Sequence, residues 1–358
     1  MVPTLMTVRP RRERVLGFAG LGLGFLVLAA ALIFALGGSS APTHHPRRPN
    51  HPSVGPAVGD TPFAADSIWN APLRADTPVA ANSTALVAEL ESQVSHFGTW
   101  INTDSYSTPI YTVPASQRRL PVTLDMPSTN PSTAELAAAF RAGVPIPPGA
   151  RPAPGTDADM VVWQPSTDTM WEMWNTRLVG NTWHARWGGR MDDVSKNPGY
   201  FTNPPNWGIA ATSLALLGGT MRISELRSGH IDHALAISIP EARTDAFAWP
   251  AQRTDGKLDS PNAIPEGTRF RINPQVDLNK LKLPPLTLMI AEAAQRYGLF
   301  VRDQSGAVCF YGEQVTQSGS SPYTGAGGIF SGLSPQQITA AFPWRDLEVV
   351  SSPVHSSE

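Results

Sequence analysis

Residues 15–38 contain no charged side chain and consist almost entirely of apolar residues and glycine. As an α-helix, a segment of this length spans the hydrocarbon layer of a membrane. Residues 1–14 carry four arginines and one glutamate, and basic flanking residues stay on the cytoplasmic side. The sequence therefore predicts a single-pass signal-anchor at the cell membrane, with a cytoplasmic basic tail (residues 1–14) and the bulk of the chain extracytoplasmic. A cleaved signal peptide is the alternative, although its apolar region is normally shorter and no clear A-x-A site is present.

The segment 39–60 is rich in proline, serine and histidine, and this composition predicts an extended linker. The remaining chain of about 300 residues is long enough for one large domain. We predict a single β-rich extracytoplasmic domain over residues 61–350 and a disordered tail over 351–358. Cys309 is the one cysteine in the sequence, which excludes an internal disulfide.

The formal net charge is −2, so the chain lacks the basic footprint of a nucleic-acid-binding protein. The 35 prolines and 30 glycines favour many turns and few long helices. We predict a mainly β fold with α+β margins, most simply an antiparallel β-sandwich or jelly roll with a few peripheral helices. The expected helices cover residues 84–96, 132–142, 223–228 and 284–297. The expected strand pairs are 108–113 with 120–125, 160–164 with 170–176, and 299–303 with 307–312.

The segment 160–240 contains the strongest functional signal, because titratable residues alternate with large aromatic residues in strand-like runs. We select Glu172, His184, Arg186 and His233 as candidate catalytic residues. The register of the strands around them remains open. A two-residue turn at Gly180 and Asn181 turns Glu172 away from His184, whereas a three-residue loop brings Glu172, His184 and Arg186 to one face of the sheet.

Aromatic side chains in this segment suit a sugar ligand, because sugar faces stack on tryptophan and tyrosine. The candidate substrate-binding residues are Trp171, Trp174, Trp187, Tyr200, Trp207 and Asp232. The predicted partner is a polysaccharide or cell-wall glycan. We expect neither a cofactor nor a metal.

Several functions fit these residues. A glycoside hydrolase needs two carboxyl groups, here Glu172 with Asp192, Asp193 or Asp232. A lyase needs a base, His184 or His233, and a group such as Arg186 that neutralises a uronate carboxylate. A non-catalytic ectodomain that binds the cell envelope would use the same aromatic residues. A less favoured alternative is a metal-dependent hydrolase, with ligands drawn from His184, His230, Asp232 and His233.

The order of several motifs resembles a widespread, largely uncharacterised family of exported proteins from actinobacteria and other soil bacteria. The motifs that carry the resemblance are SIWNAPL, VPIPPGA, MWEMW, TWHARWGG, LLGGTMRISELRSGHIDHAL, FAWPA, TRFRI and AQRYGLFVRD. They extend over most of the chain after the linker. The resemblance implies one continuous domain and draws attention to Glu172, His184 and His233, but it implies no particular reaction.

Overall fold

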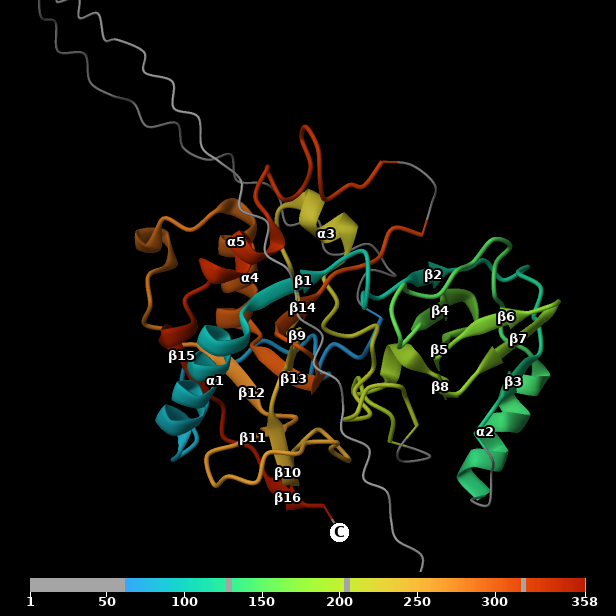
Figure 1. Ribbon diagram of the computed structural model, residues 1–358, viewed down its shortest axis with the longest axis horizontal. Coiled ribbons are helices and arrows are strands. Elements are labelled where there is room, and N and C mark those ends of the chain that lie inside the picture. The colour runs from blue at the N-terminus through green and yellow to red at the C-terminus, as the bar shows by residue number, and fades with distance from the viewer. Residues whose placement is uncertain (1–61, 127–130, 203–206, 317–319, 358) are drawn as a thin grey trace, which may run out of the picture. The chain divides into compact units, whose positions relative to one another are not determined.

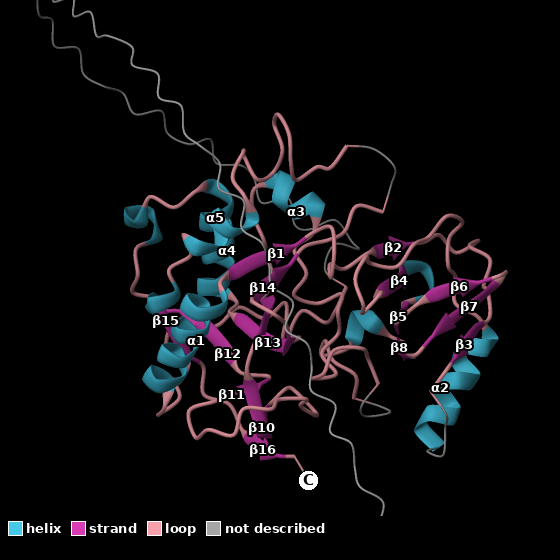
Figure 2. Ribbon diagram, in the orientation of Figure 1, coloured by secondary structure: helices cyan, strands magenta, loops and turns pink. Residues whose placement is uncertain are grey.

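β-Strands dominate the computed structural model, which describes residues 62–126, 131–202, 207–316 and 320–357. Strand residues account for 28% and helical residues for 22%, so the prediction of a β-rich fold is confirmed. The strands form four sheets (Figures 1 and 2). The predicted membrane segment at 15–38 and the linker at 39–60 lie outside the described residues.

The largest sheet has six strands in the order β1-β14-β9-β13-β12-β15. Its strands are β1 (Thr99–Asn102), β14 (Val308–Tyr311), β9 (Leu235–Ile239), β13 (Leu299–Gln304), β12 (Arg269–Ile272) and β15 (Leu347–Val349). β9 lies between β13 and β14, so the predicted hairpin of 299–303 with 307–312 is wrong. All five residues of β9 are buried, and such a strand is most stable in the interior of a sheet with a neighbour on each side.

A four-stranded sheet has the order β2-β4-β5-β8, and a three-stranded sheet has the order β3-β7-β6. Their strands are β2 (Ile110–Thr112), β4 (Met160–Gln164), β5 (Thr169–Trp174), β8 (Trp187–Met191), β3 (Val122–Leu124), β7 (Thr182–Ala185) and β6 (Arg177–Val179). β2 pairs with β4 and β3 with β7. The predicted pairing of 108–113 with 120–125 is therefore wrong, because each of these short strands finds its hydrogen-bond partner far along the chain.

The fourth sheet has the order β11-β10-β16. Its strands are β11 (Ile264–Glu266), β10 (Ala242–Ala248) and β16 (Val354–Ser356). β16 pairs with β10, so residues 351–358, which we expected to be a disordered tail, contain a paired strand. The described residues belong to one compact unit, Val54–Glu358.

The sheets are mixed rather than antiparallel. Parallel pairs occur between β1 and β14, β9 and β13, β2 and β4, β3 and β7, and β10 and β11. The antiparallel part of the fold prediction is therefore wrong. Parallel neighbours need long connections, and a strand-and-turn pattern in the sequence favours hairpins instead.

The two registers that the sequence left open for residues 170–191 are decided by a break between β7 and β8. Gly180 and Asn181 form a two-residue turn between β6 and β7, because Val179 pairs with Thr182. The chain then changes sheet at residue 186, and β8 pairs with β5. Glu172 consequently lies opposite Gly189 in one sheet, whereas His184 lies in another.

The helices occur close to the predicted positions because their signals are local. They are α1 (Ser83–Phe97), α2 (Pro131–Ala142), α3 (Ile223–Ser228), α4 (Pro285–Arg296) and α5 (Pro335–Ala340). α4 begins at a proline and buries Leu286 and Ile290 in its apolar face. α1, α4 and α5 pack on the six-stranded sheet, and α2 packs against β3 and β8 (Figure 1).

Candidate functional site

A cavity of about 1110 Å³ is lined by residues from both of the larger sheets. One side comes from β1, β13 and β14 and the other from β5 and β8. The loop before β4 and the segments 209–216 and 253–255 complete the lining. The volume exceeds that of a typical pocket for a small molecule, so the cavity is large enough for several sugar-sized units.

Large apolar side chains line this cavity, and several of them are exposed to solvent. Trp100 is 40% exposed, Tyr106 is 43% exposed and Met126 is 41% exposed. Trp174 and Trp187 are half-buried cavity residues, and they pair across β5 and β8. Exposed aromatic faces in a concave surface are typical of a binding site for a wet, partly apolar ligand.

Asp157 and Asp159 stand on the cavity wall just before β4. The Oδ1 atom of Asp159 is buried and has no hydrogen-bond partner among the described residues. Burial raises the pKa of Asp159 well above its usual value, and the negative charges of Asp157 and Asp303 raise it further. The structure therefore favours the protonated form of Asp159, and a second carboxyl group lies two residues away.

Three charged side chains, two of them fully buried, hold the segment 208–219 that forms part of the cavity wall. Arg302, in β13, donates to the carbonyls of Leu216 (3.1 Å) and Gly218 (2.9 Å). Arg253 donates to the carbonyls of Gly208, Ala210 and Ala211. Glu172 accepts a hydrogen bond from the backbone N–H of Leu216. The backbone groups of this small, apolar segment thus provide the hydrogen-bond partners of the charged side chains.

Glu172 is fully buried in β5 and does not line the cavity. Burial raises its pKa from 4.5 to about 7, while the hydrogen bond from Leu216 and the charge of Arg302 oppose that shift. Its position beneath the 208–219 segment explains the alternation of polar and aromatic residues that made it a candidate. In the structure, this carboxyl group contacts backbone rather than open space.

His184 and Arg186 lie away from Glu172. His184, in β7, contacts Asp125 (Nδ1 to Oδ1, 2.9 Å), which also accepts from Arg177 at 2.6 Å. Burial acts to raise the pKa of Asp125, but His184 and Arg177 outweigh it and lower that pKa. Arg186 is exposed and lies over the ring of Trp174, 5.5 Å from its centroid.

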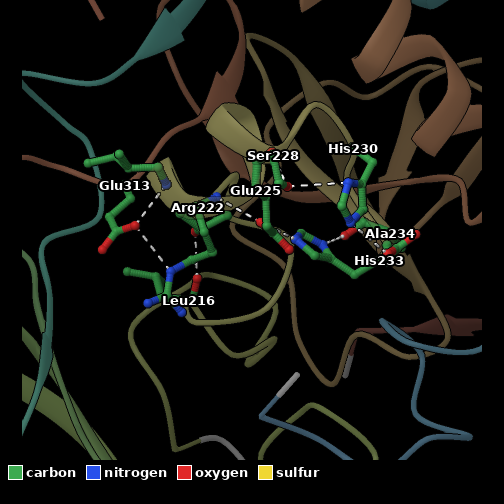
Figure 3. A network of polar contacts seen from close by, with 11 residues as sticks. Leu216, Arg222, Glu225, Ser228, His230, His233, Ala234 and Glu313 are labelled. Atoms are coloured by element: carbon green, nitrogen blue, oxygen red, sulfur yellow. Dashed lines mark hydrogen bonds and ion pairs between the residues drawn. The ribbon is translucent and has the colours of Figure 1, made fainter. Parts of the chain in front are cut away.

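His233 belongs to a separate polar network at α3 (Figure 3). Its Nδ1 donates to the carbonyl of Ala234 (2.7 Å) and its Nε2 to Glu225 Oε2 (3.2 Å). Burial acts to lower the pKa of His233, but the Glu225 carboxylate outweighs it and the pKa is raised. Because both ring nitrogens face acceptors, the network favours the protonated imidazole of His233, whose contact with Glu225 ties it to α3. Arg222 extends the network to Glu313 (3.2 Å).

The four candidate catalytic residues therefore do not share a cleft, and the expected grouping of Glu172, His184, Arg186 and His233 is corrected. The cause is the change of sheet at residue 186, together with the separate position of α3. The metal alternative is corrected as well, because within the described residues His184, His230, Asp232 and His233 do not form a group close enough to hold one ion.

The six candidate substrate-binding residues divide into two groups. Trp174 and Trp187 line the cavity. Trp171 is fully buried with Arg119 over its ring, and Trp207 is buried and donates to Ser132 Oγ at 3.0 Å. Tyr200 packs edge-on against Trp249, and Asp232 pairs with His230 at 3.3 Å.

A second acidic group borders the cavity at Asp255, Glu266 and Asp303. One carboxylate oxygen of each lies within 4.8 Å of the other two. Burial raises the pKa of Glu266 to about 9 and that of Asp303 to about 7, and the neighbouring carboxylates add to both shifts. In the part of the chain that the structure describes, no other group of histidine, cysteine and carboxylate side chains approaches as closely.

The sequence interpretation missed Asp159, Asp303, Arg302 and Trp100. A signal was present in the run LFVRDQ, where two charged residues follow an apolar strand, and in the DAD triplet before β4. Charged residues at the ends of apolar strands are candidates for a site between sheets.

Comparisons with protein-family models, with curated proteins and with solved structures found no match to this chain. The resemblance to exported soil-bacterial proteins therefore stays a prediction. Within the described residues, no helix has the length and apolar character needed to cross a membrane.

Proposed function

We propose that the cavity binds and hydrolyses a polysaccharide, as a glycoside hydrolase does. The observation that carries the proposal is the presence, in one cavity, of exposed aromatic faces and of Asp159, whose pKa is raised and whose Oδ1 has no hydrogen-bond partner among the described residues. We also propose that the protein acts outside the cytoplasm, anchored through residues 15–38. We propose in addition that the six- and four-stranded sheets form a sandwich with the cavity between them.

In this proposal, Asp159 is the general acid. Its carboxylic acid protonates the glycosidic oxygen as the bond to the sugar breaks, and Asp157 serves as the second carboxylate that activates water. Two carboxyl groups with different protonation states are the pattern that this chemistry needs. Trp174, Trp187 and Trp100 supply faces on which sugar rings stack.

A uronate lyase fits the cavity less well. Its substrate carries a carboxylate at each sugar, which must be neutralised by a cation. Arg253 and Arg302 direct guanidinium donors to backbone carbonyls, and Arg186 lies over Trp174. The negative charge of Asp157 on the same wall would repel an anionic polymer, so a neutral or cationic polysaccharide is the expected substrate.

The test uses the full-length chain with neutral, cationic and anionic polysaccharides, measuring new reducing ends and binding. The Asp159→Asn variant should lose activity by about 10²–10⁴-fold while it still binds the polymer. The matched control is Glu241→Gln, which changes an exposed carboxylate that does not line the cavity.

Equal activity in the Asp159→Asn variant and the wild type would overturn the role of Asp159. Binding by the wild type without any new reducing ends would favour the alternative, a non-catalytic ectodomain with the same aromatic surface. Absence of both binding and cleavage across the panel would overturn the proposal.

A further inference from the structure

Three carboxylates converge where three segments of the chain meet. Glu266 is the last residue of β11, Asp303 lies near the end of β13, and Asp255 belongs to the loop between β10 and β11. Gly267 donates from its backbone N–H to the carbonyl of Val301 at 2.8 Å, which fixes the end of β11 against β13. The close approach of the carboxylates is thus a product of the sheet framework rather than of mobile side chains.

Among the residues that the structure describes, no direct ion pair neutralises this group, although the charges of Arg253 and Arg302 act on it from a longer distance. None of the three carboxylates forms an ion pair within residues 62–126, 131–202, 207–316 and 320–357. Arg253 is close in sequence, but its guanidinium donates to the carbonyls of 208–211. Like charges held together in a partly buried place are destabilising unless a counter-charge is present.

Glu266 gives a second and independent observation. The residue is fully buried, and its Oε1 atom has no hydrogen-bond partner among the described residues. Its other oxygen, Oε2, accepts from the backbone N–H of Asp255 at 3.0 Å. The same carboxylate belongs to the group in which one oxygen of each residue lies within 4.8 Å of the other two. A buried, unsatisfied carboxylate oxygen is costly, and a bound cation would remove that cost.

We propose that Asp255, Glu266 and Asp303 bind one divalent cation of the Ca²⁺ type. Their oxygens all lie within 4.8 Å of one another, so none is too far from the others to bind one Ca²⁺ ion at about 2.4 Å. Carboxylates are the only ligands present, with no histidine or cysteine in the group, and this donor set suits a hard cation rather than zinc.

The cation would join the loop that contains Asp255 to β11 and β13. Gln304 already donates from Nε2 to the carbonyl oxygen and to Oδ1 of Asp255, at 2.8 and 2.9 Å. Arg253 lies two residues before Asp255 and holds the carbonyls of 208–211 on the cavity wall. The ion therefore stabilises one wall of the cavity, and its binding is independent of whether the cavity cleaves a polysaccharide.

The experiment measures Ca²⁺ binding by calorimetry to the full-length chain after removal of metal with a chelator. The expected result is about one Ca²⁺ per chain, a higher melting temperature with Ca²⁺, and weaker binding of Mg²⁺. Glu266→Gln should weaken Ca²⁺ binding at least about tenfold, and Asp255→Asn, at an exposed position, should do the same. The matched control, Glu241→Gln, changes an exposed glutamate outside the group and should bind as the wild type does.

Two results would overturn this site. One is absence of Ca²⁺ binding at millimolar concentration with an unchanged melting temperature. The other is wild-type Ca²⁺ affinity in Asp255→Asn, which keeps its exposed position and gives a folded reference even if Glu266→Gln unfolds. Neither result depends on polysaccharide activity, so failure of this site is distinguishable from failure of the proposed function.

Discussion

The buried carboxyl group of Glu172 should make the free energy of unfolding fall as pH rises, and the Glu172→Gln substitution should remove that part of the pH dependence. Its pKa rises from 4.5 in the unfolded chain to about 7 in the folded protein. At about 1.4 kcal/mol per pKa unit, that difference corresponds to about 3 kcal/mol. Because the folded protein holds the proton more tightly, this stabilisation is complete below the unfolded pKa and is lost as pH rises through the folded pKa.

Glu172→Gln removes the titration and keeps a side-chain oxygen for the N–H of Leu216. We would measure the free energy of unfolding by urea titration from about pH 4 to pH 8 in the wild type and in the variant. The wild-type value minus the variant value should fall by about 3 kcal/mol across this range, mostly between pH 5 and 7. Asp159 contributes a smaller part, because the charge of Glu172 also raises its pKa.

The control is Glu241→Gln, which removes an exposed carboxylate and should give a difference that does not change with pH. A wild-type minus Glu172→Gln difference that stays constant within about 1 kcal/mol from pH 4 to 8 would refute the reasoning. Such a result would mean that the backbone donors stabilise the ionised carboxylate of Glu172 to the same degree as water does in the unfolded chain.

Three further outcomes are expected. Gly267→Ala should lower the free energy of unfolding by more than about 2 kcal/mol, because φ is +87° and the new Cβ meets a backbone carbonyl. The control Gly306→Ala places its Cβ in open space, and equal melting temperatures of the two variants would contradict this prediction. His233→Gln should lower the free energy of unfolding more at about pH 5 than at about pH 9. The pKa of His233 in the folded protein lies above 6.5, and its contribution to stability is lost as pH rises through that pKa. A loss of stability that is the same at both pH values in urea titrations would contradict this prediction. Trp100→Ala should weaken polysaccharide binding about fivefold with little change in melting temperature, and unchanged binding would remove Trp100 from the site.

Local signals in the sequence predicted the helices well. The apolar spacing in α4, its initial proline and the glycine that follows it are all contained in one short window. Sheet partners are different, because the pairing of β2 with β4 and of β9 with both β13 and β14 joins segments that are far apart in the sequence. The alternation in 170–174 correctly indicates a strand, but it does not reveal which neighbour that strand has.

The candidate site was misplaced for a related reason. Glu172 between Trp171 and Met173 has the same pattern whether it faces a ligand or a buried backbone. The structure shows that it accepts from Leu216 in the small apolar segment 208–219. The identity of that partner is not encoded near Glu172. Asp159 and Asp303 were missed because each is a single acid at a strand end, and only the folding of two sheets brings them to one cavity.

This arrangement decides which experiments can separate structure from chemistry. Glu172, Arg302 and Arg253 hold the cavity wall through backbone groups, so substitutions there would alter ligand binding by moving the wall. Asp159 differs, because its Oδ1 has no partner that its removal would leave unsatisfied. Loss of activity with retained binding in Asp159→Asn is therefore evidence for acid catalysis, whereas the same loss in a Glu172 variant is evidence only for a displaced wall.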